Sequence, residues 1–539
     1  MPSGKIFLRL LAALAVGCGA PAGASTAVVP DSFPTIQAAI DSWRDTVLVR
    51  AGRYDEDLRV MTGVTLLPYP SGAGNDTVRA GGLSIQKMVW PPLPPSPPQR
   101  ASLSVRGFRF GGRVQKEPLQ ELVVTYVTLE ACRLDSGAFL DSAAELRSVV
   151  VRGCYSRGPL RANAVYATFT DDSVLGGGIY AHAEGSYEIR RNYVHGPAPY
   201  GISAYTDDRE ASIDSNTVVA ADVGILAWGE RPRAINNRVT DCAGSGILMS
   251  SASPDILGNT VLRCGGYGIE NPWYGSVVEI SGNTVMACER GGIFVRADRP
   301  FVTGNVVGRC GGAGIDLEPP DYPPPLGAVS LGSNTSYLNQ GPGYLLNTRT
   351  GYPAGVGHNI AFGNLGPGLS CGAGINAALS CNDWYGNVGG VVAGTVPGVT
   401  DVSAHPLFCN LQEDDVQLSA GSPLLNLGAC GLVGALGQGC TQAVDVPVVK
   451  PSARTTLVAS PNPGRGAIRF SWSGEAEPEW LDVYDVTGAR RWRARLGLGA
   501  DALAWPGTDL QGRVLPAGAY YARLTGRNGS AGTTFVLIK

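Results

Sequence analysis

The chain has 539 residues, of which 74 are glycine and 38 are proline, and only 16% of its residues are charged. Because a glycine in a helix interior costs about 1 kcal/mol relative to alanine, this composition excludes a mainly helical protein. The formal net charge of −3 excludes a general electrostatic affinity for nucleic acid, and the 44% of hydrophobic residues excludes wholesale disorder. We therefore expect a large, turn-rich β protein.

The first 24 residues predict a secretory signal peptide. Lys5 and Arg9 come before the short apolar run Leu10–Gly17, and Ala22-Gly23-Ala24 offers a cleavage site. A run this short does not span a bilayer. The alternative is a lipoprotein signal, in which Cys18 would carry the lipid. Both alternatives predict an exported protein that does not span the membrane and in which disulfides are permitted.

A sequence repeat runs from about residue 130 to residue 395. An asparagine recurs at intervals of 21 to 29 residues, and a glycine usually follows it nine residues later, with isoleucine next, as in Gly224-Ile225. In four successive repeats a cysteine stands five residues after the asparagine. The recurring asparagines are Asn192, Asn216, Asn237, Asn259, Asn283, Asn305, Asn334, Asn359 and Asn382.

Each repeat holds three short apolar stretches, which near Asn283 are 278–280, 284–285 and 293–295. Three short strands with their turns fill one coil of a parallel β-helix, whose coils stack at a strand spacing of about 4.8 Å. Leucine-rich repeats share the period, but their L-x-x-L-x-L frame is absent. Asparagine tolerates a left-handed turn and hydrogen-bonds to its equivalent in the next coil. We predict such a ladder from Asn216, Asn237, Asn259, Asn283 and Asn305.

The segment before the repeats predicts an amphipathic helix over 34–43, in which Ile36, Ala39, Ile40 and Trp43 share one face. Together with the strand-like stretch 45–49 and the repeats, this region resembles the right-handed parallel β-helix of the pectin-lyase-like superfamily, from about residue 27 to 440. The resemblance implies an all-β solenoid over 25–443 whose N-terminal helix caps the open end of the core. It implies little about activity.

The cysteines fall into two groups. Cys242, Cys264, Cys288 and Cys310 form a column that we expect to be a buried stack of free thiols, and the spacing of Cys154 to Gly158 places Cys154 in the same column. Among the C-terminal five we expect one or two disulfides whose partners the sequence does not determine. These five are Cys371, Cys381, Cys409, Cys430 and Cys440.

The pattern changes after a Val/Pro/Lys linker at 444–453. Short alternating strands, including Ala467–Trp472 and Leu481–Val486, predict a β-sandwich over 454–539. The stretches Pro461-Asn462-Pro463, Val483–Gly488 and Pro516–Leu524 resemble the C-terminal sorting domain of type IX secretion and its relative, the flagellar-hook-type Ig-like domain. The resemblance implies export by secretion machinery to the exterior or outer cell surface of a Gram-negative bacterium. An accessory Ig-like module without a sorting role is the alternative.

On the strand that begins with Gly-Ile, the second and fourth residues after glycine should face outward. The outward set holds rings and polar groups one coil apart, which suits an extended polysaccharide or cell-surface glycan, because rings stack on sugar faces and polar groups bind hydroxyls. The candidate glycan-binding residues are Tyr180, His182, Tyr205, Trp228, Phe294 and Arg296.

Catalysis by this face would need a pair of carboxylates. Asp316 and Glu318 face the same way and form the best pair, with Glu270 two coils away. The chain lacks the R-x-P-x-x-R motif of lyases, the N-T-D, G-H-G and R-I-K set of polygalacturonases and the D-P-H-D of alginate epimerases. No metal-ligand spacing is present, so no cofactor is expected, although a lyase would use Ca²⁺. We therefore favour non-catalytic glycan binding or adhesion. The first alternative is a polysaccharide lyase or glycoside hydrolase that acts on an extended acidic glycan, and the second is a structural surface protein.

Overall fold

The computed structural model describes residues 25–61, 63–70, 78–86, 101–117, 125–141, 146–206, 211–318, 327–347, 353–372, 375–442, 456–473, 478–485, 489–496, 500–509, 511–526 and 529–538. The predicted signal peptide and linker lie outside these residues. The chain divides into two compact units, Met1–Thr260 and Val261–Lys539, which are described separately. The predicted fold class is confirmed: the protein is nearly all β, and its main part is a right-handed parallel β-helix.

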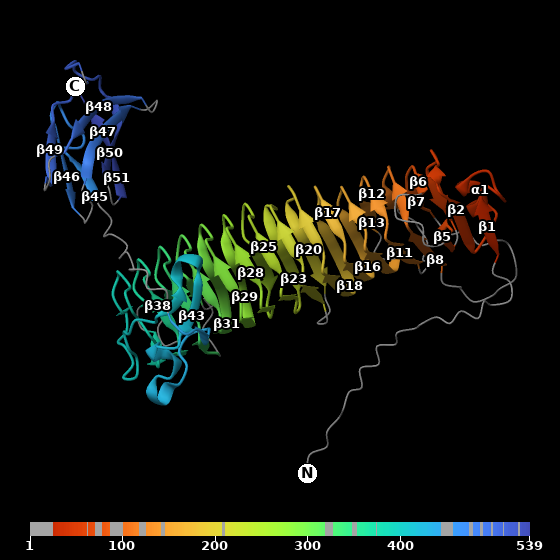
Figure 1. Ribbon diagram of the computed structural model, residues 1–539, viewed down its shortest axis with the longest axis horizontal. Helices are drawn as coiled ribbons and strands as arrows, with labels where there is room; N and C mark the ends of the chain where they lie inside the picture. The colour runs from red at the N-terminus through yellow and green to blue at the C-terminus, as the bar shows by residue number, and fades with distance from the viewer. Residues whose placement is uncertain are drawn as a thin grey trace, which may run out of the picture. The chain divides into compact units, whose positions relative to one another are not determined.

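In the first unit each coil adds strands to two parallel sheets, and its coils lie side by side in Figure 1, from red to green. The strands of the second sheet are β3 (Gly52–Arg53), β6 (Val78–Ala80), β9 (Phe108–Phe110), β12 (Arg133–Leu134), β15 (Tyr155–Ser156), β17 (Ser173–Leu175), β19 (Tyr193–His195), β22 (Thr217–Val219) and β25 (Arg238–Thr240). Those of the first sheet are β1 (Thr26–Val29), β2 (Thr46–Arg50), β4 (Leu58–Val60), β5 (Val64–Tyr69), β7 (Leu83–Ile85), β8 (Ala101–Arg106), β10 (Val114–Lys116), β11 (Thr125–Glu130), β13 (Ala138–Asp141), β14 (Leu146–Arg152), β16 (Leu160–Thr170), β18 (Ile179–Arg190), β20 (Tyr200–Thr206), β21 (Ser212–Asp214), β23 (Val223–Gly229), β24 (Arg233–Ile235), β26 (Ile247–Ser251) and β27 (Asp255–Leu257).

The strands alternate between the core and the solvent as a two-residue period requires. In β23, Ile225 and Ala227 are fully buried, whereas Leu226 and Trp228 point outward and are partly exposed. The glycine that precedes this strand segment, Gly224, has no room for a side chain, because a Cβ atom would lie 2.3 Å from Val239 Cγ1. The Gly-Ile column of the sequence therefore marks a point such as Gly224, where the neighbouring strand leaves no room for a side chain.

The single α-helix of the described chain, α1 (Ile36–Asp41), is shorter than predicted. Thr35 caps it by accepting a hydrogen bond from the Ala38 N–H at 3.0 Å, and Ile36, Ala39 and Ile40 are buried. The expectation that Trp43 shares the buried face is wrong: Trp43 has a φ of 60° and is 51% exposed, because the helix has already ended. That α1 protects the end of the core stays a prediction.

The second unit repeats the same coil. Its first-sheet strands are β29 (Tyr267–Ser281), β31 (Gly291–Thr303), β33 (Ile315–Glu318), β34 (Val329–Gly332), β36 (Tyr344–Leu346), β37 (Pro353–Gly357), β39 (Leu369–Cys371), β40 (Asn376–Ser380) and β41 (Val392–Ala393). Its second-sheet strands are β30 (Thr284–Met286), β32 (Val306–Gly308), β35 (Thr335–Tyr337) and β38 (Ile360–Phe362), and a small sheet of β42 (Phe408–Asn410), β43 (Asp415–Ser419) and β44 (Gln438–Cys440) follows.

The recurring asparagines are buried and form hydrogen-bonded ladders within each unit. In the first unit the Asn216 Nδ2 donates to Asn237 Oδ1 at 3.0 Å, and the Asn237 Nδ2 donates to Asn259 Oδ1 at 3.0 Å. In the second unit Asn283 donates to Asn305 Oδ1 at 2.9 Å. That ladder continues through Asn334, Asn359 and Asn382, and its last acceptor is Asp401 Oδ1.

The left-handed conformation belongs to the residue before each ladder asparagine rather than to the asparagine itself. Ser215 and Asn236 have φ values of 56° and 54°, and Gly282 has a φ of 66°. This turn aims the next side chain into the coil, where its amide meets the amide of the neighbouring coil. Our expectation that asparagine is chosen for a left-handed turn is therefore wrong, since its role is the inward hydrogen bond.

A second ladder replaces the cysteine column toward the end of the solenoid. The Cys310 backbone N–H donates to Asn339 Oδ1 at 2.9 Å, and Asn339 is linked in turn to Asn364 and Asn387. Cys242, Cys264, Cys288 and Cys310 are buried and carry free thiols, as predicted. Cys154, however, belongs to the first ladder, because its N–H donates to Asp172 Oδ1 at 2.7 Å and the Asp172 N–H donates to Asn192 Oδ1.

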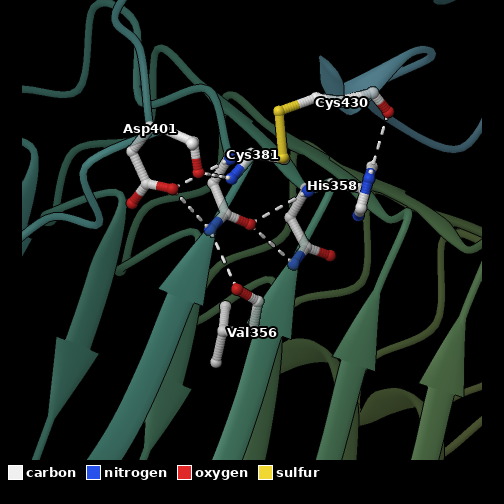
Figure 2. Close-up of a disulfide and its surroundings, with 8 residues drawn as sticks. Val356, His358, Cys381, Asp401 and Cys430 are labelled. Atoms are coloured by element: carbon white, nitrogen blue, oxygen red, sulfur yellow. Dashed lines mark hydrogen bonds between the residues drawn. A yellow bond between two sulfur atoms is a disulfide. The ribbon is translucent and has the colours of Figure 1, made fainter.

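Two disulfides join four of the five C-terminal cysteines, in agreement with the expectation of one or two bonds. They are Cys381–Cys430 and Cys409–Cys440, and Cys371 is free and buried. Figure 2 shows Cys381–Cys430 beside the final ladder bonds, with Asp401 accepting from Asn382. The disulfide therefore lies where the ladder of the second unit, from Asn283 to Asp401, ends.

The chain after the linker forms two antiparallel sheets. One contains β45 (Thr456–Ser460), β46 (Ile468–Ser473) and β49 (Ala502–Trp505). The other has the order β48 (Arg490–Arg495), β47 (Pro478–Asp485), β50 (Gly518–Gly526) and β51 (Gly529–Leu537). Residues of both sheets share one buried core around Phe470, Trp505 and Phe535. Kinship with an Ig-like or sorting domain stays a prediction.

Candidate functional site

The outward face of the first sheet in the first unit carries a row of rings in register. His182 on β18 pairs with Tyr205 on β20, and Tyr205 pairs with Trp228 on β23. The ring centroids of His182 and Tyr205 are 4.7 Å apart, and those of Tyr205 and Trp228 are 5.7 Å apart. Because the strands are parallel and in register, one ring follows another along the coil axis. We call these three residues the aromatic row.

Tyr180 lies on β18 together with His182 but outside the aromatic row. The Arg161 guanidinium lies 4.6 Å from the Tyr180 ring centroid, and burial raises the pKa of the Tyr180 hydroxyl. Arg161 is also 5.9 Å from Phe139, over which Arg113 lies at 4.9 Å. Arginines and rings thus alternate from coil to coil. Sequence analysis missed Arg113, Phe139 and Arg161, because their coils lack the Gly-Ile signal that marked the later strands.

In the second unit the outward face is charged. Arg296 on β31 pairs in register with Glu318 on β33, and its Nε donates to Glu318 Oε2 at 2.7 Å. The Asn347 Nδ2 donates to the other carboxylate oxygen at 3.3 Å. Glu318 is therefore held as an ion-paired carboxylate between the two neighbouring coils.

Asp316 faces the same way as Glu318 but lies in a different environment. Burial, and after it the neighbouring Glu318 carboxylate, raise the pKa of Asp316 to about 7. Its Oδ1 is buried without a hydrogen-bond partner among the described residues. Two carboxyl groups on one strand thus lie in different environments, Glu318 in an ion pair and Asp316 buried with a raised pKa, and a buried carboxyl group of this kind can serve as a proton donor.

Phe294 is less accessible than the outward position suggests. Its side chain is only 7% exposed, because the Tyr267 ring stacks on it at 5.0 Å and the Arg296 guanidinium lies 5.4 Å from its centroid. Arg290 in turn lies over Tyr267 at 4.8 Å. Tyr267 and Arg290 were not predicted, since they precede the Gly-Ile position. Glu270 pairs in register with Phe294, as its spacing predicts.

Among the residues that the structure describes, no three histidine, cysteine, aspartate or glutamate residues are grouped so as to hold a metal ion. No helix within the same residues is long and apolar enough to cross a membrane.

A family model described as the right-handed beta helix region matches residues 177–321, in agreement with the coil architecture. No curated protein matches the sequence. Among solved structures, the A-module of the mannuronan C-5 epimerase AlgE4 of Azotobacter vinelandii is 12% identical with a TM-score of 0.32, and the match covers 69% of this chain and 95% of that one. The tailspike protein of E. coli bacteriophage HK620, solved with a hexasaccharide, is 11% identical with a TM-score of 0.27, covering 93% and 88%. Likenesses this weak carry no argument about the site.

Proposed function

We propose that this is an exported or cell-surface protein that binds a glycan without cleaving it. The observation that carries the proposal is the aromatic row: His182, Tyr205 and Trp228 stand in register on three adjacent strands with partly or fully exposed rings. Aromatic rings offer a rigid apolar face with a polar rim, which suits the alternating apolar and hydroxyl surfaces of a sugar. A linear glycan lying across the strands would meet a ring at each coil.

Binding is tested on a glycan array with the mature protein and two single variants. Trp228→Ala and Tyr205→Ala should each weaken binding by about tenfold, because each removes a central ring contact. The matched control is Tyr193→Ala, which removes a ring that is 42% exposed but lies on the second sheet. Equal loss in the control would contradict the assignment, and no binding to any glycan would favour a structural surface protein.

The second candidate function is a polysaccharide lyase or glycoside hydrolase, and it rests on the contrast between Asp316 and Glu318. A neutral Asp316 could donate a proton to a leaving oxygen, beside the Glu318 carboxyl group that Arg296 holds in place. Each glycan that binds is incubated with the protein and the products are analysed. Shortened or unsaturated oligosaccharides that disappear in Asp316→Asn and in Glu318→Gln would establish the enzyme and overturn the non-catalytic proposal.

We further propose that the domains are a signal peptide at 1–24, a β-helix at 25–443, a linker at 444–453 and a C-terminal sorting domain at 454–539 that engages secretion machinery. The separate buried core of the last segment supports a module of its own. Deletion of 454–539 in the native bacterium should leave the protein inside the cell envelope, measured by protease accessibility on intact cells. Unchanged surface exposure would show that this module has no sorting role.

A further inference from the structure

Four arginines of the first unit occupy the same register position in four successive coils of the second sheet. Arg53 pairs with Arg79, Arg79 with Arg109, and Arg109 with Arg133. Neighbouring strands in a sheet lie about 4.8 Å apart, so the backbone positions of these arginines follow one another at that spacing. The next residue in the row is Tyr155, whose ring lies 4.9 Å from the Arg133 guanidinium. We call Arg53, Arg79, Arg109 and Arg133 the arginine row.

Carboxylates pair with some of the arginines of the row. The Nε groups of Arg109 and Arg133 are 2.9 and 3.4 Å from the two oxygens of Asp135, and the Arg53 Nε is 2.7 Å from Asp55. Among the described residues Arg79 forms no ion pair, and its side chain is exposed. Asp55 and Asp135 thus pair with three of the four arginines, and adjacent like charges repel unless an anion lies between them.

A hollow of about 330 Å³ opens at the centre of the row. Its lining includes Arg53, Arg79 and Arg109, and Asp55 is the one acidic residue among the described residues that form it. The position two residues after each arginine explains the hollow. Asp55 and Asp135 occupy this position in the outer coils, whereas Gly81 and Gly111 occupy it in the two middle coils and contribute no side chain of their own. The Asp57 carboxylate lies beside Gly81, since a Cβ atom there would be 2.5 Å from Asp57 Oδ1.

From this geometry we infer a second binding site, in which the arginine row holds a linear acidic polysaccharide that carries one carboxylate per sugar residue. The site lies on a different sheet from the aromatic row and does not depend on the glycan proposed for that row. A planar guanidinium binds a carboxylate through two parallel hydrogen bonds, and the row offers one such group on each of four successive coils. Carboxylates of a chain that runs along the row would thus lie within reach of the arginines, and Arg79 would gain an ion-pair partner, which it lacks among the described residues.

The test uses the mature full-length protein and two probes of equal length, β-1,4-linked glucuronic acid oligomers and cello-oligosaccharides, which share a backbone and differ in the carboxylates. Calorimetric titration should detect binding of the glucuronic acid oligomer only, with an affinity that falls as salt is added. Arg79→Gln and Arg109→Gln should each weaken it by about tenfold. Unchanged thermal unfolding of the variants would show that both fold.

The matched control is Arg238→Gln, since Arg238 is exposed and lies in the same row farther along the sheet, where its register neighbour Thr217 is uncharged. The control should bind like the wild type, as should Trp228→Ala. Equal affinity for the neutral probe, an equal loss in Arg238→Gln, or tighter binding of single-stranded DNA would each overturn the proposal. Loss of binding in Trp228→Ala with full binding in Arg79→Gln would also overturn it, while leaving the function proposed for the aromatic row intact.

Discussion

Asp172 stands in the first asparagine ladder at a position where the following coils carry an amide. Its Oδ1 accepts from the Cys154 N–H, but its Oδ2 is buried without a partner among the described residues. Burial raises the pKa of Asp172 to about 8. A neutral carboxyl group can imitate the asparagine amide, because its hydroxyl can donate where the amide Nδ2 would. At the residue scale this buried position of the ladder therefore favours the protonated form of Asp172.

Asp172→Asn should stabilise the protein, and the gain should grow with pH. The folded-state pKa of about 8 lies above the ordinary value of 3.8, so the folded state binds the proton more tightly and wild-type stability falls as pH rises between these values. The amide does not titrate, so we expect about 1–3 kcal/mol more stability for the variant at pH 8 and much less at pH 4. Urea unfolding of the wild type and the variant at pH 4 and pH 8 measures this difference in the free energy of unfolding.

The neighbouring Asp171 provides the control with the opposite sign. It is exposed and pairs with Arg191 at 2.7 Å, and this hydrogen bond lowers the pKa of Asp171. Its stabilisation is therefore present above the ordinary pKa and lost in acid, so Asp171→Asn should lose a little stability at pH 8. A gain in Asp172→Asn that did not change with pH would contradict a protonated carboxyl group in the ladder.

At the scale of the structural element, each ladder asparagine satisfies several buried groups at once. Asn237 Oδ1 accepts from both the N–H and the Nδ2 of Asn216, and the Asn237 Nδ2 donates to Ile213 O and Asn259 Oδ1. Asn237→Ala should therefore cost about 2–4 kcal/mol, because it leaves several buried polar groups unpaired. Arg238→Ala, one residue away and exposed, is the control and should cost less than about 0.5 kcal/mol. Similar losses in the two variants would show that the ladder contributes little.

The elements also show how far a sequence can predict this protein. The Gly-Ile column correctly predicted that Ile225 and Ala227 are buried and that Trp228 faces outward, because the two-residue period is a local property. The second ladder at Asn339, Asn364 and Asn387 was missed because cysteine and asparagine share one position, and a column defined by residue type ends where the type changes. The covering of Phe294 by Tyr267 could not be predicted, since burial on the outer face depends on side chains of the adjacent coil.

At the scale of the whole molecule, a solenoid coil contacts only its neighbours, so the last coil has an open side that must be held in another way. In the second unit that end is held by Cys381–Cys430 and Cys409–Cys440, which close segments with sequence separations of 49 and 31 residues. A disulfide that closes a segment of this length stabilises the folded state by about 2–4 kcal/mol, chiefly by restricting the unfolded chain. Removal of either disulfide should therefore destabilise the neighbouring coils first.

We expect the double variant Cys381→Ala, Cys430→Ala to increase amide hydrogen exchange in β38, β40 and the residues around Asp401, while exchange in the first unit stays unchanged. The reason is that Asn382, which donates the last ladder bond to Asp401, is the residue after Cys381, and Asp401 lies near this disulfide (Figure 2). Cys264→Ala is the matched control, because it removes a buried cysteine that forms no disulfide. Faster exchange throughout both units in the double variant would contradict a stack that frays from its end, and would show instead that the disulfides support the solenoid as one cooperative body.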